Sequence, residues 1–154
     1  MLTPYAALLI LHLLAAAYWV GGMALMHTVV RPTAVALLAP PQRLPFLSAA
    51  LGRFFVYAGV AIAVVLLSGL AMVEIAGGFA VVRRSVHAMF GLGLVMAAIY
   101  AHLRWRLHPR LRRAVDVQDW AGAGAQLGLI RQRVFLNLWL GIAVFLVAVV
   151  GRMG

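Results

Sequence analysis

The chain has 154 residues, of which 66% are hydrophobic and only 10% are charged, whereas about a quarter of residues are charged in soluble domains. This composition excludes an ordinary soluble domain and predicts an integral membrane protein. Thirteen basic residues against three acidic ones give a formal charge of +10. Because the arginines lie between apolar stretches, we attribute them to membrane topology and expect no nucleic-acid binding. The absence of cysteine excludes disulfides and thiolate metal sites.

Four apolar stretches are long enough to cross about 30 Å of hydrocarbon. They predict transmembrane helices at residues 5–30, 54–73, 85–103 and 134–150. The first helix is expected to end at Arg31, because the residue before a proline is disfavoured in helical geometry. Residues 33–52 contain several prolines and predict a surface connection with one or two helical turns.

A basic run from Arg104 to Arg113 follows the third span, and we expect His108 within it to be a solvated loop residue. Asp116 is predicted to cap the next helix, with Asp119 in its first turn. That helix is predicted to lead without a break into the fourth span. The expected fold is all-α, a four-transmembrane-helix bundle with a cytoplasmic amphipathic helix leading into the fourth span, in one domain over residues 1–154.

Arginine is distributed unevenly between the two sides of this bundle. Four crossings place both termini on one side, and the two connections on the other side carry ten arginines: Arg31, Arg43, Arg53, Arg104, Arg106, Arg110, Arg112, Arg113, Arg131 and Arg133. The terminal side carries only Arg83, Arg84 and Arg152. Since arginine-rich loops stay in the cytoplasm, we expect a multi-pass protein of a bacterial inner membrane with both termini in the periplasm.

The first span carries a stripe of polarizable side chains. At 100° per residue, one face about a third of the helix wide holds the whole set. Its members are His12, Trp19, Met23, Met26 and His27. This face is therefore the first candidate for a binding site.

Spans one and three cross in the same direction, and each carries two histidines fifteen residues apart, His12 and His27 in one and His87 and His102 in the other. Fifteen helical residues span about 22 Å, so His12 is expected at the depth of His87, and His27 at that of His102. Two facing imidazoles at one depth are what axial ligation of haem b requires. We predict one haem b at the outer pair and treat the inner pair as candidate ligands of a second.

Residues beside these pairs are candidates for further haem contacts. The face of span three that holds His87 also holds small residues that leave room for a porphyrin. Trp19 is placed to pack on the edge of the macrocycle. Arginines at the membrane surface are candidate propionate ligands: Arg83 and Arg84 at the outer pair, and Arg31, Arg53 and Arg104 at the inner pair.

The stripe also supports a copper hypothesis. Thioether and imidazole groups suit Cu(I), and no thiolate is available to compete with them. The alternative copper ligands are Met23, Met26 and Met89, together with His12 or His27. Methionine in an apolar helix is most often a packing residue, so the spacing alone leaves haem and copper both open.

Several segments resemble the copper resistance protein D (CopD) family. They are residues 11–22 (LHLLAAAYWVGG), 31–32 (RP), 41–45 (PQRLP), 53–55 (RFF), 86–89 (VHAM) and 111–120 (LRRAVDVQDW). The resemblance covers nearly the whole chain and implies a link to copper uptake or resistance at the inner membrane. The related HemJ-type protoporphyrinogen oxidases, which bind haem, share His12 and a His-x-Lys motif at His87. Met89 replaces that lysine here, which argues against oxidase activity.

Three hypotheses from different classes result. The preferred one is a haem b redox protein, which as an enzyme would be a membrane oxidoreductase with a quinone or another redox protein as partner. The second is a copper-binding membrane protein for transport or resistance, and the third is a cofactor-free structural subunit of a membrane complex. In all three the lipid bilayer is a partner, and a homo-oligomer or a larger complex is compatible with the bundle.

Overall fold

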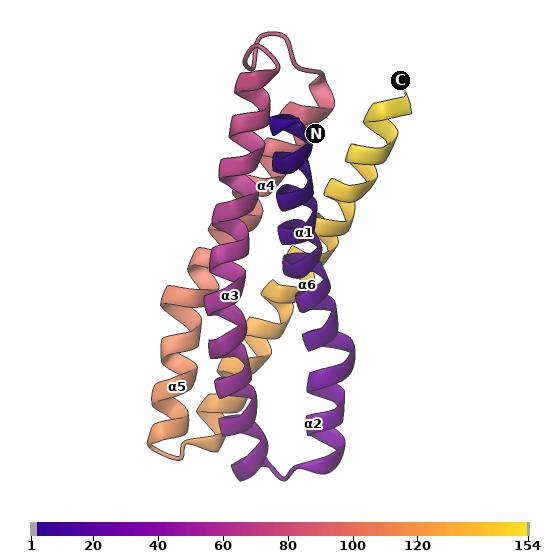
Figure 1. Ribbon diagram of the computed structural model, residues 1–154. Helices are drawn as coiled ribbons and strands as arrows, with labels where there is room; N and C mark the ends of the chain where they lie inside the picture. Colours follow the sequence, from indigo (N-terminus) through magenta and orange to yellow (C-terminus); the bar gives the residue numbers. More distant parts are fainter. Residues whose placement is uncertain (1–2, 154) are drawn as a thin grey trace.

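The chain folds into a bundle of four long helices (Figure 1). This computed structural model describes residues 3–153, and the side chain of Arg152, which was predicted on the terminal side, lies outside the described part. The fold is 91% helical, with no strand in the part of the chain described. The predicted all-α fold with four helices able to span a membrane is confirmed.

The first long helix consists of α1 (Pro4–Leu25), the π-helical turn η1 (Met26–Val30) and α2 (Arg31–Leu37). The prediction that it ends at Arg31 was wrong, because Arg31 keeps helical dihedral angles of φ −66° and ψ −51°. A proline ring normally collides with the carbonyl one turn before it. The wider π-turn, in which the Arg31 N–H bonds to the Met26 carbonyl, moves the backbone ahead of the proline and lets the helix continue.

The connection to the second long helix is only two residues long. Leu38 and Ala39 are extended, and α3 (Pro40–Ile75) then runs for 36 residues. The predicted surface connection over residues 33–52 was therefore wrong. Its first two prolines occupy the start of α3, where a missing N–H leaves no hydrogen bond unmade. These two prolines begin the helix, and Pro45 lies inside it without ending it.

Gly77 and Gly78 make the turn after α3 with positive φ angles of 103° and 90°, which glycine adopts without steric cost. The third long helix follows as α4 (Arg84–His102), the π-turn η2 (Leu103–Leu107) and α5 (His108–Asp116). As in the first helix, a π-turn directly precedes the proline-containing segment. The basic run predicted as a loop is thus helical.

The fourth long helix, α6 (Trp120–Met153), is continuous, which agrees with the predicted amphipathic entry into span four. The Gly122 N–H donates to Asp119 Oδ1 at 2.9 Å, so Asp119 caps this helix. Asp116 was wrongly predicted as the cap, since it is the last residue of α5. Gln118, with φ of 58°, reverses the chain between the two helices.

Replacing Asp119 with alanine is expected to lower the free energy of unfolding by about 1 kcal/mol, because a cap acceptor is lost. Asp116→Ala is the matched control, since a carboxylate at the end of α5 opposes the helix dipole and its removal is expected to be neutral or slightly stabilising. Thermal unfolding in detergent, followed by circular dichroism, measures both. Equal destabilisation by the two substitutions would contradict this assignment of the cap.

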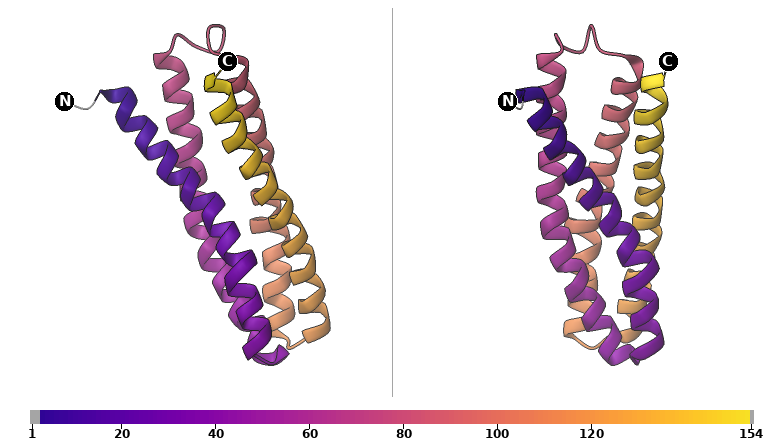
Figure 2. Two further views of the ribbon diagram at one scale, coloured as in Figure 1. Left: turned by 90° about the vertical axis from the view of Figure 1, so that its right-hand side faces the viewer. Right: turned by 45° about the vertical axis from the view of Figure 1, so that its right-hand side comes forward.

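The helices pack as two hairpins, with α1 along α3 and α4 along α6. The second hairpin contacts the first through α3 and α1. Figure 2 shows that the N-terminal half of α1 diverges from α4 and α6, so these contacts of α1 belong to its C-terminal half. The long helices have 32–36 residues, or about 50 Å of helix, which exceeds about 30 Å of hydrocarbon. One end of the bundle therefore extends beyond the apolar region of a membrane.

That end is opposite the termini (Figure 1). It comprises residues 31–53 and 104–133, which carry the ten arginines named above, and we call it the arginine-rich end. Many of the most deeply buried side chains belong to it or lie at its border: Phe55, Leu47, Leu103, Leu111 and Ile130. A helical end that extends beyond the hydrocarbon is stabilised by burying apolar side chains away from water.

Candidate functional site

The polarizable stripe of α1 faces the interior of the bundle. Trp19 and Met23 are buried, and His12, Met26 and His27 are half-buried. The stripe nevertheless meets a different neighbour at each level. Three local environments result, one near the termini, one in the middle and one at the arginine-rich end.

Near the termini, His12 packs on α3. Its Nδ1 lies 3.0 Å from Ser68 Oγ, and the Ser68 hydroxyl donates to the Val64 carbonyl. Since the hydroxyl has one proton, we assign the ring proton to Nδ1, which leaves Nε2 as a free acceptor. A Cβ at Gly69 would lie 3.2 Å from the His12 ring, so the glycine makes room for the imidazole. The ring is thus oriented as metal-ligating histidines commonly are.

His87 lies in a separate environment. Its Nδ1 is 3.3 Å from the Arg83 carbonyl, its ring packs against Phe79 at 5.6 Å, and it is exposed. The small-residue face of α4 that includes Gly91 and Ala98 is exposed as well and faces away from the bundle. The structure does not bring His87 and His12 together. Ser68 is the neighbour of the His12 ring, whereas Phe79 is the neighbour of the His87 ring.

The inner histidines are also apart. His27 stacks on Phe135 of α6 at 5.0 Å with an interplanar angle of 29°, whereas His102 is exposed at the end of α4. The arginines proposed as propionate ligands have separate surroundings. Arg83 donates to the Gly151 carbonyl at 3.0 Å. Of the others, Arg84 and Arg53 are exposed, and Arg31 and Arg104 are half-buried.

His108, predicted to be solvated, is buried with 4% of its surface exposed. Its Nε2–H donates to the Ser48 carbonyl at 3.0 Å, and its ring meets that of Phe55 edge-on at 5.5 Å. Nδ1 is buried without a hydrogen-bond partner among the described residues. Leucines at positions 103, 107 and 111 repeat at helical spacing, a signal that could have placed His108 on a buried helical face.

In the middle of the bundle, two thioethers are buried. Met23 of α1 and Met96 of α4 are each 2% exposed and belong to one apolar cluster. The Asn137 amide donates to the Met96 carbonyl at 3.3 Å. Gly141 admits this packing, since a Cβ there would lie 2.7 Å from Val20 and 3.2 Å from Met96 Cε. Side chains of α1, α4 and α6 therefore meet at this level.

Met89, predicted as an alternative copper ligand, is half-buried near the start of α4 and lies outside this cluster. Met26 is half-buried and lines a cleft at the border of the arginine-rich end. The described residues include no group of three or more histidine, aspartate or glutamate side chains that could hold a metal. The thioethers Met23 and Met96 are consequently the buried soft ligands that the fold brings into one cluster.

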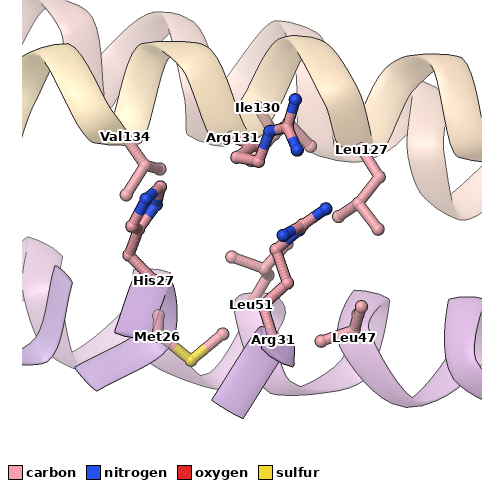
Figure 3. A pocket seen from close by; sticks show the side chains of 9 residues that line it. All are labelled: Met26, His27, Arg31, Leu47, Leu51, Leu127, Ile130, Arg131 and Val134. Atoms are coloured by element: carbon pink, nitrogen blue, oxygen red, sulfur yellow. The ribbon is translucent and has the colours of Figure 1, made fainter. Parts of the chain in front are cut away.

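A cleft opens between η1, α2, α3 and α6 where the apolar region meets the arginine-rich end (Figure 3). Its lining consists of Met26, His27, Arg31, Leu47, Leu51, Leu127, Ile130, Arg131 and Val134. The cavity measures about 40 Å³, far less than the 300–1,000 Å³ of typical small-molecule sites. It is too small to enclose a macrocycle beside His27.

Four long apolar helices, each able to span a membrane, define a polytopic α-helical membrane protein. The family model described as CopD, copper resistance protein D, matches residues 48–151, which is more than half of the chain. The chain belongs to this family, so the resemblance seen in the sequence is confirmed. No curated protein and no solved structure matches it.

Proposed function

We propose that this CopD-family protein handles copper as Cu(I) within a membrane. The family description refers to copper resistance. The observation that carries the proposal is the burial of two thioethers, Met23 and Met96, in the core of the bundle. Val20, one turn before Met23, and Met96 both pack at Gly141. Thioethers are soft ligands suited to Cu(I). Copper in this proposal is cargo that the protein binds and releases.

Two histidines of the first long helix, His12 in α1 and His27 in η1, supply further ligands along the same helix axis. His12 lies about 16 Å from Met23 toward the termini, and His27 about 6 Å from it toward the arginine-rich end, at 1.5 Å per residue. The free Nε2 of His12 supplies a ligand on the terminal side. Few ligands at each level bind an ion weakly enough to release it, which favours transfer over storage.

We further propose that the membrane is a bacterial inner membrane, with the arginine-rich end in the cytoplasm and both termini in the periplasm. Ten arginines on one side against three on the other support this orientation. The whole chain, residues 1–154, is proposed to form one domain. The test is a reporter protein that is active only in the cytoplasm, fused to either terminus. A signal from such a fusion would contradict this topology.

The copper proposal is tested by titrating detergent-purified protein with Cu(I), under reducing and anaerobic conditions, against a chromogenic Cu(I) chelator. Wild-type protein is expected to withdraw copper from the chelator. Replacing Met23 and Met96 together with leucine, which preserves volume, is expected to weaken binding about tenfold or more. Met89→Leu is the control, because it removes a thioether of α4 outside the cluster.

Two results would contradict the proposal: no retention of Cu(I) by wild-type protein, or equal retention by the double variant. The same sample also tests haem b ligation, which stays a prediction. The quinone or redox-protein partner, the structural-subunit hypothesis and the oligomer stay predictions as well. Absorption spectra of the oxidised and the dithionite-reduced protein would reveal haem by a Soret band. If that band disappeared in His12→Ala and in His87→Ala, the result would contradict the copper proposal and support haem ligation by these two histidines.

A further inference from the structure

The cleft in Figure 3 concentrates positive charge that the chain itself does not neutralise. Arg31 on α2 and Arg131 on α6 both line it, and Figure 3 shows the Arg31 side chain extending across the cleft toward α6. The Arg31 guanidinium is repelled by those of Arg131 and Arg43. The chain has three acidic residues, and none of them lines the cleft. An anion from outside the chain is the group that would offset this repulsion.

The guanidinium groups indicate the kind of anion. A guanidinium donates hydrogen bonds in a planar fork that fits two oxygens of a phosphate or a carboxylate. Two guanidiniums from different helices can therefore share one phosphate and draw α2 and α6 together. Because Arg31 is half-buried, its charge is less screened than that of a fully exposed arginine.

The rest of the cleft is apolar, which distinguishes a lipid from a free anion. Met26, Leu127 and Val134 line it beside the arginines. Outward from the cleft, the aromatic surface continues through Phe135, which is exposed and stacks on His27, to exposed Trp139, whose ring lies 6.2 Å from that of Phe135. Such a surface accommodates acyl chains, and tryptophan is typical of the membrane interface.

The cleft also lies at the depth that a lipid headgroup occupies. It is where the apolar stretches of the helices end and the arginine-rich end begins. Its cavity of about 40 Å³ admits part of a headgroup and leaves the acyl chains outside along α6. We propose that the cleft binds one anionic phospholipid, with its phosphate between Arg31 and Arg131, additional attraction from Arg43, and its acyl chains against Val134 and Phe135.

The test compares thermal unfolding of purified protein in a neutral detergent after addition of phosphatidylglycerol, phosphatidylcholine or inorganic phosphate. Phosphatidylglycerol is expected to raise the melting temperature of wild-type protein more than the other two. Arg31→Gln and Arg131→Gln are each expected to weaken the apparent affinity about tenfold, because each removes a charge-assisted hydrogen bond. Both variants are also expected to unfold at a higher temperature than wild type without lipid, since a repulsion is removed.

Arg133→Gln is the matched control, because Arg133 is an exposed arginine of α6 outside the cleft. It removes the same charge and is expected to leave the response to phosphatidylglycerol unchanged. Equal responses to phosphatidylglycerol and phosphatidylcholine, or an unaltered response in both cleft variants, would overturn the proposal. A response to inorganic phosphate as large as that to phosphatidylglycerol would overturn the proposal that the ligand is a lipid, and it would indicate that the cleft binds a free anion.

Discussion

Phe55→Ala is expected to lower the free energy of unfolding by about 3–5 kcal/mol, the cost typical of removing a buried aromatic ring. Phe55 is 1% exposed and contacts the rings of Phe54, Tyr100 and His108 at centroid distances of 6.0, 6.0 and 5.5 Å. Its carbonyl accepts the Tyr100 hydroxyl at 2.6 Å. The substitution leaves a cavity where α3, α4 and α5 meet.

Tyr57→Ala is the control for this prediction, because Tyr57 is an aromatic residue of the same helix that is 63% exposed. Its effect is expected to stay within about 0.5 kcal/mol. Unfolding by a denaturing detergent in mixed micelles, followed by circular dichroism, measures both variants. A Phe55→Ala protein as stable as Tyr57→Ala would show that the interior at this junction does not hold the hairpins together.

The second large effect is expected at His108, where substitution by alanine should cost about 2–3 kcal/mol. The Ser48 carbonyl loses its imidazole donor, and one such hydrogen bond contributes about 1 kcal/mol to stability. The substitution also removes the ring that packs on Phe55. Since Nδ1 of His108 already has no partner among the described residues, part of the cost is offset, which keeps the effect below that of Phe55→Ala.

A conservative variant separates the hydrogen bond from the packing. His108→Gln places an amide N–H near the position of Nε2 and is expected to recover about half of the lost stability. His102→Ala, at an exposed histidine of the same long helix, is expected to have no measurable effect. If His108→Gln were as unstable as His108→Ala, the hydrogen bond to Ser48 would not contribute, and if His102→Ala were equally unstable, burial would not distinguish the two histidines.

The amino-acid sequence predicted the membrane class, the four long helices and the continuous entry into the fourth span, because these depend on local properties. A helix that crosses hydrocarbon must satisfy its backbone internally and be apolar over about twenty residues, and both requirements can be recognised one segment at a time. The family was likewise apparent from segments such as residues 86–89 and 111–120, and it is confirmed by the match over residues 48–151, which includes both. The stripe on α1 was predicted as one face, and that face is directed into the bundle.

The helix boundaries at the prolines required the backbone itself. Arg31 and His108 each precede a proline, and in both places a π-turn ends at the preceding residue and allows the helix to continue. The rule that a residue before proline leaves helical geometry describes an α-helix with regular hydrogen bonds. The sequence contains no signal for the wider turn, so residues 33–52 and the basic run after the third span were predicted as connections.

Which side chains meet was decided by the tertiary structure. Helical periodicity assigned His12 and His87 to a face of their helices and to a depth in the membrane. It gives the direction of each side chain only around its own helix axis, and it does not specify which other helix that side chain meets. Packing placed Ser68 beside His12, Phe79 beside His87 and Met96 in the cluster of Met23. The sequence by itself therefore determined the spans and their charges, whereas the neighbours of each candidate ligand follow from rotations of whole helices, which depend on all their contacts at once.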